Sequence, residues 1–195
     1  QDSSLDIGSR LALLRRGARD GRLEVVRRSA AQMQRLVSRI DRGTADFLRY
    51  KTLTASSPEH EWIGVLCAAA WPDRIGQRRA AAGQARYLLA NGRGALLARS
   101  DPLGNAEYLV ALDLLDSERE AKILLGAAVT KAVLEDLFAA RIVDEANVRW
   151  DTSADAVVAR RQRRLAALVL EDKPQTESDE AAVSKAMLEG INILG

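Results

Sequence analysis

Three clusters rich in arginine hold the residues of this chain that are best suited to contacting another molecule. Arginine presents a planar guanidinium that donates paired hydrogen bonds to a phosphate and can also stack on a base. Clusters of this kind therefore predict contacts with the backbone of a nucleic acid. The clusters are Arg74, Gln77, Arg78 and Arg79; then Arg86 and Arg93; and then Arg160, Arg161, Arg163 and Arg164.

Each cluster also has a structural interpretation. The first could be an arginine-rich strand, and Arg93 could be a solvated residue at the tip of a turn. In an extended strand, Arg160 and Arg164 share one face while Arg161 and Arg163 share the other, so the four cannot all reach one ligand. We expect one face to pair with acids such as Asp151, Asp155 or Glu171. The other face could line a groove.

Catalytic constellations are missing from the sequence. His60 is the single histidine and Cys67 the single cysteine, which argues against a zinc site and excludes an internal disulfide. Cys67 lies in an apolar run, as an inert buried thiol does. No phosphate-binding Gly-x-x-x-x-Gly-Lys loop and no Gly-x-Ser-x-Gly elbow occurs.

Composition limits the mode of binding. The 195 residues contain 29 Lys and Arg against 27 Asp and Glu, which gives a net charge of +2. Because this total is small, the attraction of a nucleic acid would have to come from local arginine clusters. Only 4% of the residues are aromatic, which limits base stacking. We expect Trp62, Trp71 and Trp150 to be core residues. Tyr87 is the best candidate for base stacking, although core packing is favoured for it as well. Any nucleic-acid binding should then be mostly electrostatic and poor in sequence specificity.

Helices are expected in the first part of the chain. Apolar residues recur at helical spacing over 5–55, as at the end of a helical bundle, and the arginines between them are interpreted as a solvated face. A break at 55–58 follows, where Ser57 can cap a helix and Pro58 suits its first turn. That helix should end at Trp71, because Pro72 comes next.

Short strands are expected after Pro72. Two apolar runs flank Asn91-Gly92, which is a strong hairpin signal. Further strands are expected at 107–115 and 121–129, then a short helix after Thr130. A second hairpin should join 148–150 to a strand from 156 to about 170, and a last helix should cover 179–189. This order predicts an α+β chain whose middle part is an OB-like small antiparallel β-barrel, partly open, of about five strands.

Several of these segments resemble the HrpB-type bacterial DEAH/DExH-box helicases, which are ATP-dependent. The resemblance covers roughly residues 60–175. It is carried by several separate motifs in the same order, namely 70–79, 87–95, 100–103, 148–151 and 159–165. Residues 1–55 and 176–195 match only in helical character and in the run Leu188-Glu189-Gly190-Ile191.

The resemblance implies a ratchet-like helical segment at 1–57, an OB-like domain with an inserted helix at 58–140, and a family-specific hairpin and helix at 141–195. It also implies a motor that uses ATP and Mg²⁺, of which this chain carries no motif, so we expect no cofactor in the chain itself. The start at Gln1, without an initiator Met or leader, is interpreted as a cut inside a longer cytoplasmic protein.

Two functions follow from these observations. The first is an accessory module of an RNA helicase that binds single-stranded RNA or DNA through arginine–phosphate contacts. The second is a protein-interaction or regulatory module that docks on the motor domains or on a partner protein. No membrane partner is expected, since no apolar stretch approaches the roughly 20 residues of a membrane span.

Overall fold

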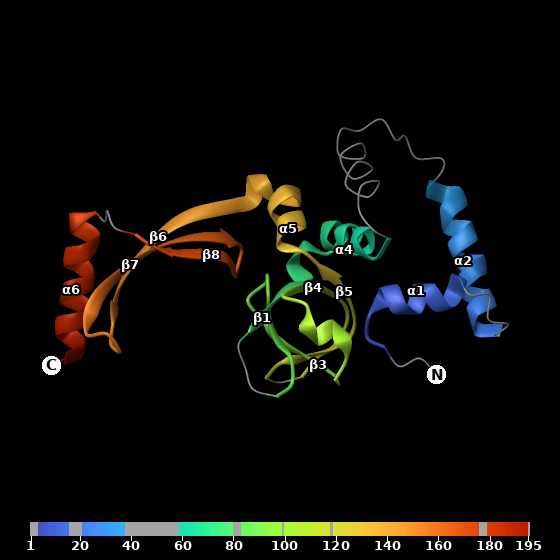
Figure 1. The fold of residues 1–195 in the computed structure, drawn as a ribbon, viewed down its shortest axis with the longest axis horizontal. Helices are drawn as coiled ribbons and strands as arrows, with labels where there is room; N and C mark the ends of the chain where they lie inside the picture. The colour runs from blue at the N-terminus through green and yellow to red at the C-terminus, as the bar shows by residue number, and fades with distance from the viewer. Residues whose placement is uncertain are drawn as a thin grey trace. The chain divides into compact units, whose positions relative to one another are not determined.

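The computed structural model describes residues 4–15, 21–37, 59–79, 83–98, 100–117, 119–175 and 179–194. The chain divides into two compact units, Gln1–Leu137 and Phe138–Gly195. The helices expected within 38–55 and the break at 55–58 lie outside the described residues. Within the described part, the α+β class and the order of helices, barrel, extra sheet and terminal helix are confirmed (Figure 1).

The first unit contains helices and a β-barrel. Its elements are α1 (Ile7–Arg15), α2 (Gly21–Val37), α4 (Glu59–Ala70), the 3-10 helix η1 (Pro72–Arg74), β1 (Ile75–Arg79), β2 (Arg86–Leu89), β3 (Gly94–Leu97), the 3-10 helix η2 (Pro102–Asn105), β4 (Tyr108–Leu115), β5 (Ala121–Val129) and α5 (Lys131–Leu137).

The five strands of the barrel close in the order β1-β2-β3-β5-β4, with β4 pairing back onto β1. All pairs are antiparallel except β3 and β5, which run parallel. The expected small barrel of about five strands is confirmed, and it differs from the expected form in two details: it is closed, not partly open, and one of its strand pairs is parallel. A closed ring with an odd number of strands cannot alternate in direction all the way round, so closure itself requires one parallel pair.

The tight turn between β2 and β3 forms where the sequence predicts it. Gly92 has a φ of +86°, a conformation that glycine adopts without steric cost. The side-chain oxygen of Asn91 accepts a hydrogen bond from the backbone N–H of Arg93 at 3.0 Å. The backbone N–H of Leu89 then bonds the carbonyl of Arg93 at 2.8 Å, which closes the hairpin.

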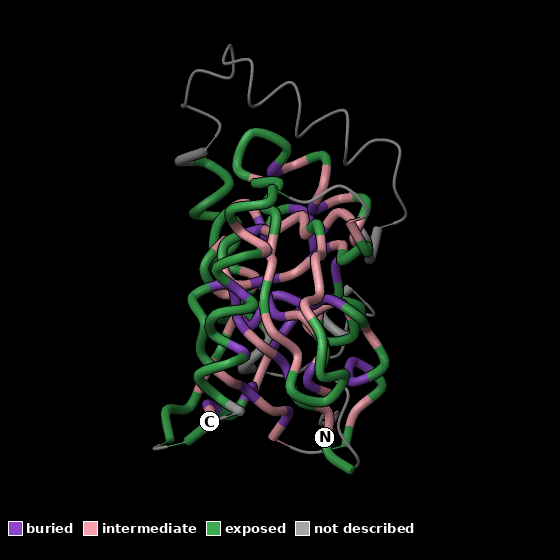
Figure 2. The backbone as a smooth tube through the Cα atoms, turned by 90° about the vertical axis from the view of Figure 1, so that its left-hand side faces the viewer, coloured by how far each residue is buried: buried purple, intermediate pink, exposed green. Residues whose placement is uncertain are grey.

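The barrel interior forms the main core of this unit, and Figure 2 marks the buried residues of the chain in purple. Gly76 lies inside, where a Cβ would come within 3.1 Å of Leu89 and 3.3 Å of Tyr87, so only glycine lets these side chains fill the space. Other fully enclosed residues of the core are Ala95, Leu97, Leu109, Ala111, Ala121 and Ile123.

The N-terminal segment contributes to this core, which the sequence does not suggest. Leu5 is 2% exposed and belongs to the barrel's core cluster. Its carbonyl accepts a hydrogen bond from the N–H of Gly126 at 2.8 Å, and its own N–H bonds the carboxylate of Asp101 at 2.8 Å. Leu5 was expected to begin a helical segment whose partners are missing; instead it is part of the barrel.

The second unit contains η3 (Ala139–Arg141), β6 (Ile142–Asp151), β7 (Ala156–Leu165), β8 (Leu168–Pro174) and α6 (Glu180–Leu194). The strands form an antiparallel sheet in the order β6-β7-β8. The expected hairpin is formed by β6 and β7, but its second strand ends at Leu165 and does not run on to about residue 170. The chain turns at Ala166, whose φ is +52°, and comes back as β8. No glycine or asparagine marks this turn, so the sequence gives no turn signal.

Helix α6 packs against β6 and β7. The contact is close at Gly190, where an added Cβ would overlap the indole of Trp150. Trp150, Val148 and Ala146 alternate along β6, so they share one face of the sheet, and α6 covers that face. The other face of the sheet carries Arg149 and Arg160, which are described below.

Candidate functional site

Arg74 and Gln77, the first residues of the first cluster, are bonded into the barrel. The guanidinium of Arg74 donates from Nη1 to the carbonyl of Leu112 on β4 at 3.1 Å. The amide of Gln77 donates from Nε2 to the hydroxyl of Tyr108 at 3.2 Å. Both bonds join the start of β1 to its neighbour β4, so these two side chains help to hold the barrel closed.

Tyr108 receives that bond in a buried position, 1% exposed. Burial is the main cause that raises the pKa of Tyr108 to about 12, the nearby carboxylate of Glu107 raises it further, and the bond from Gln77 lowers it. The hydroxyl therefore stays protonated at every physiological pH, so Tyr108 is a structural residue of the barrel wall.

Arg78 and Arg79 are consecutive residues at the end of β1, and they differ from the other arginines. Among the described residues, no carboxylate lies within ion-pair distance of either guanidinium and no side-chain hydrogen bond is formed by either. Both side chains are exposed. Because side chains alternate along a strand, the two point to opposite faces of β1. Arg78 lines a pocket of about 450 Å³ at the end of the barrel.

The second cluster, around the β2–β3 hairpin, is paired with acids. Arg93 bonds Asp116 at 2.7 Å and the carbonyl of Ser117 at 3.2 Å, which fastens the hairpin tip to the segment after β4. Arg86 lies 3.6 Å from the carboxylate of Glu120. These contacts reduce the positive charge that this end of the barrel presents to a phosphate.

The aromatic residues do not all lie where they were expected. Tyr87 is fully buried and donates its hydroxyl to the carbonyl of Ala106 at 3.0 Å, which confirms a core role. Trp71 was expected in the core, but it is 44% exposed between α4 and η1. Pro72 ends the helix at this point and leaves the indole at the surface. An exposed indole offers a face on which a base can stack.

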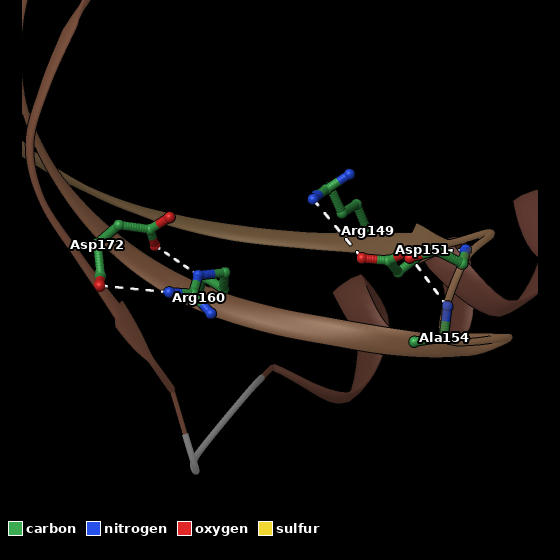
Figure 3. Close-up of polar contacts among 6 residues, drawn as sticks. Arg149, Asp151, Ala154, Arg160 and Asp172 are labelled. Carbon is green, nitrogen blue, oxygen red and sulfur yellow. Dashed lines mark hydrogen bonds and ion pairs between the residues drawn. The ribbon is translucent and has the colours of Figure 1, made fainter. Parts of the chain in front are cut away.

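The third cluster lies on β7 and is paired on both faces of the sheet. On one face, Arg160 bonds Asp172 on β8 at 2.6 Å and Arg164 lies 3.9 Å from Glu145 on β6. On the other, Arg163 lies 3.7 Å from Glu171 and Arg161 lies 3.8 Å from Asp144. The expected division into two faces is confirmed, and of the acids named as partners Glu171 takes that role. Asp151 instead lies beside Arg149, at 3.8 Å (Figure 3).

Cross-strand pairing explains this arrangement. Residues opposite each other in an antiparallel pair lie on the same face, and Arg163 is opposite both Asp144 and Glu171. The other three arginines reach an acid diagonally on a neighbouring strand, namely Arg160 to Asp172, Arg161 to Asp144 and Arg164 to Glu145. We call these four ion pairs the arginine ladder. Its charges are largely balanced, so its attraction for a polyanion is weak.

Two carboxyl groups of the same sheet, those of Asp172 and Asp151, have a lowered pKa. The hydrogen bond from Arg160 is the main cause that holds the pKa of Asp172 below its ordinary value. The hydroxyl and backbone N–H of Ser153 do the same for Asp151, with the N–H of Ala154 adding to the effect. Asp151 thereby fixes the turn from β6 to β7, where Figure 3 shows its carboxylate directed at Ala154.

Other candidates for chemistry give no site. Cys67 is buried in α4, and burial raises the pKa of its thiol, so it is a poor nucleophile. The parts of the chain that the structure describes contain no group of His, Cys, Asp and Glu able to hold a metal ion. None of the described helices is long and apolar enough to cross a membrane.

Comparison with known proteins identifies the origin of the chain. The family profile of "ATP-dependent RNA helicase HrpB, connector region" matches residues 141–175, which are strands β6, β7 and β8. The ATP-dependent RNA helicase HrpB of Escherichia coli (strain K12) is 34% identical over 135 residues, which are 68% of this chain. The chain is a C-terminal region of the HrpB type.

The likeness extends to the fold. The crystal structure of the E. coli DExH-box NTPase HrpB superposes with a TM-score of 0.61 at 28% identity and covers 99% of this chain. The HrpB-type region spans only 16% of the length of the curated E. coli protein and 21% of the chain in that crystal structure. The segment that matches the family profile is the one that carries the arginine ladder.

Proposed function

We propose that the chain is an accessory module of an ATP-dependent RNA helicase and that its barrel holds single-stranded nucleic acid by arginine–phosphate contacts. The similarity to helicases of the HrpB type supports the first part of this proposal. ATP and Mg²⁺ would then be bound by motor domains outside this chain. A single buried cysteine fits a protein of the reducing cytoplasm.

One observation supports this choice of binding surface. Arg78 and Arg79 lie on opposite faces at the end of β1, and neither is paired with an acid among the described residues, so the two can contact different phosphates of one strand. A phosphate can bond such a guanidinium without first displacing a carboxylate. The other candidate residues already have partners. Polar contacts within the barrel unit engage Arg74, Gln77, Arg86 and Arg93. The ion pairs of the arginine ladder engage Arg160, Arg161, Arg163 and Arg164. The proposed contact therefore centres on the end of β1, with the exposed indole of Trp71 on the same unit as a stacking residue.

Fluorescence anisotropy with a labelled single-stranded RNA tests this proposal on the full 195-residue chain. We expect binding at about 50 mM salt in the micromolar range or weaker, falling steeply toward about 200 mM. The double variant Arg78→Ala/Arg79→Ala should weaken binding and reduce the slope of log K against log salt by about 1.4, the value for two lost phosphate contacts on a single strand.

The matched control is Arg160→Ala/Arg164→Ala, which removes the same charge from arginines that are already paired. We expect it to leave RNA affinity nearly unchanged. Binding that fails to appear even at low salt would contradict the proposal. Equal loss of affinity in both double variants would contradict the choice of surface, because the response would then follow net charge alone.

A protein-docking role is the second candidate function, and an apolar surface on α6 favours it. Met187, Leu188, Ile191 and Ile193 are 52–64% exposed along this helix, while Ala186 and Gly190 face the sheet. Exposed apolar residues gathered on one helix are typical of a surface that another protein covers. Association with separately purified motor domains that resists salt, without affinity for RNA, would favour docking over nucleic-acid binding.

A further inference from the structure

Arg78 faces the inside of the barrel rather than its outer wall. It lies directly opposite Tyr87 on β2, and opposite residues in an antiparallel pair share a face. Tyr87 is buried in the barrel core, and Gly76, two residues before Arg78, is also inside. Burial raises the pKa of Tyr87 and the positive charge of Arg78 lowers it, so the guanidinium lies near enough to the tyrosine for the two to interact electrostatically. Arg78 therefore sits at one open end of the barrel.

A pocket occupies this end of the barrel, which we call the barrel mouth. Arg78 forms one side, the segment 83–85 before β2 forms another, and Gly104 and Asn105 of η2 form a third. Gly104 is buried, and a Cβ there would come within 3.1 Å of both Ala85 and Leu97, so η2 sits tightly on the strands. The volume of about 450 Å³ lies in the range of small-ligand sites, about 300–1,000 Å³.

The groups around the barrel mouth can recognise a charged ligand with polar edges. Gln84 donates from Nε2 to the carbonyl of Leu97, which fixes its amide and leaves its oxygen to accept another bond. Asn105 and Ser100 are exposed at the rim and can both donate and accept.

Asp101 is the acid that lines the barrel mouth among the described residues, and both of its oxygens accept hydrogen bonds. Oδ1 of Asp101 accepts the N–H of Leu103 at 2.9 Å. Oδ2 accepts the N–H of Leu5 at 2.8 Å and the hydroxyl of Ser4 at 3.2 Å. Asp101 thus anchors the N-terminal segment and does not pair with Arg78. The guanidinium remains free to bind an anion.

We propose that the barrel mouth binds a single nucleotide, with its phosphate on Arg78 and the edge of its base on the amides of Gln84 and Asn105. Arginine matches a phosphate with two parallel hydrogen bonds, and amide side chains match the donors and acceptors of a base. The choice of a nucleotide as the ligand rests on the proposed function. The pocket and its unpaired arginine are features of the structure and do not depend on that function. The site is separate from the outer face of β1, on which Arg79 lies.

Isothermal titration of the full chain with adenosine monophosphate, adenosine and inorganic phosphate tests this site. We expect the nucleotide to bind more tightly than either of its parts, because both halves of the pocket are then used. Arg78→Ala should weaken nucleotide binding about tenfold or more, the effect of losing a charge-assisted bond. Arg160→Ala removes the same charge from an arginine that is already paired with Asp172, and it should change nucleotide binding less than about twofold.

A second variant guards against loss of folding in Arg78→Ala. Asn105→Trp places a bulky side chain on an exposed position of the rim and should also abolish nucleotide binding, while the thermal unfolding midpoint stays near that of the parent. No nucleotide binding by the parent chain, or equal binding by the parent and Arg78→Ala, overturns the site. A loss of nucleotide binding in Arg160→Ala as large as that in Arg78→Ala overturns the site as well.

Competition separates the possible sources of the nucleotide. A 5′-phosphorylated RNA that displaces adenosine monophosphate, where its 5′-hydroxyl counterpart does not, supports the site and points to a strand end. Failure of both RNAs to displace it supports a free nucleotide. RNA binding without nucleotide binding overturns the barrel-mouth site and leaves the proposed function standing. Nucleotide binding without RNA binding supports the site and counts against the proposed function.

Discussion

Arg160 holds Asp172 by two bonds, one from Nε to the carboxylate at 2.6 Å and one from its terminal nitrogen to the backbone carbonyl at 3.3 Å (Figure 3). The pair therefore fixes both the side chain and the main chain of β8 against β7. The side chains are about one third exposed, so the contribution to stability is that of a surface pair, up to about 1 kcal/mol.

The first prediction concerns the pH dependence of this pair. The pKa of Asp172 is lowered from its ordinary value of 3.8, mainly by the bond from Arg160. A lowered pKa in the folded state means that the pair stabilises the fold above that ordinary value and loses its effect as the pH falls through the lower, folded pKa. We expect Asp172→Asn to unfold at a lower temperature than the parent at neutral pH.

Thermal melts of both proteins across pH 7 to about pH 2 measure this effect. The difference between the two melting temperatures should shrink below the ordinary pKa of an aspartate. Asp155→Asn is the matched control, since its carboxyl has no ion pair among the described residues. A difference that stays constant down to the lowest pH would contradict the prediction.

The second prediction concerns the docking of α6. An added side chain at Gly190 would overlap Trp150, so Gly190→Val should destabilise the second unit by about 1–3 kcal/mol, the usual cost of overpacking. Hydrogen–deuterium exchange should then be faster in α6 and β6 and unchanged in β1–β5. Ser184→Val, on an exposed position of the same helix, is the control. Equal exchange rates in the two variants would show that Gly190 is not a contact residue.

The third prediction concerns Leu5. Its burial in the barrel core predicts that Leu5→Ala costs about 2–5 kcal/mol, the range for a buried leucine, although Leu5 is far from the barrel in sequence. Leu66→Ala removes the same atoms from a side chain that is 44% exposed and should cost much less. Urea unfolding of the three proteins measures both free energies. A small loss for Leu5→Ala would mean that the N-terminal segment does not stay in the barrel.

The fourth prediction is a gain in stability, whereas the preceding variants are expected to lose stability. Ala166 adopts a φ of +52°, which costs a residue with a Cβ about 1 kcal/mol. Ala166→Gly should therefore stabilise the second unit by up to about 1 kcal/mol, after the entropy lost by a glycine is subtracted. Ala167→Gly, one residue later in the same turn, should destabilise it slightly. A lower melting temperature for Ala166→Gly than for the parent would contradict this account of the turn.

The elements that the sequence predicts correctly are those with local signals. Asn91-Gly92 specifies a turn between two apolar runs, and Pro72 ends the helix before it. These signals act through the backbone preferences of a few neighbouring residues, so they can be identified in one sequence. The turn at Ala166 has no such signal, because its conformation is imposed by the pairing of Leu165 with Leu168 and by burial of both.

Features that depend on distant contacts could not be predicted. Nothing near Leu5 indicates that it enters a barrel whose first strand begins 70 residues later, at Ile75. The third arginine cluster has the composition of a phosphate-binding segment, and only the register of three strands reveals its carboxylate partners. Arg78 and Arg79 are the same residue type at consecutive positions, so the sequence does not distinguish them. The closure of the barrel places Arg78 at the barrel mouth and Arg79 on the outer face.

The position of Leu5 in the barrel core determines where a separately expressed barrel fragment has to begin. A fragment that begins at Glu59 would contain all five strands of the barrel, so its sequence alone would suggest a complete barrel. It would lack the leucine that fills the interior and the partners that occupy the carboxylate of Asp101. The smallest expressible version of the barrel therefore either begins at or before Ser4, or receives residues 4–6 as a separate peptide.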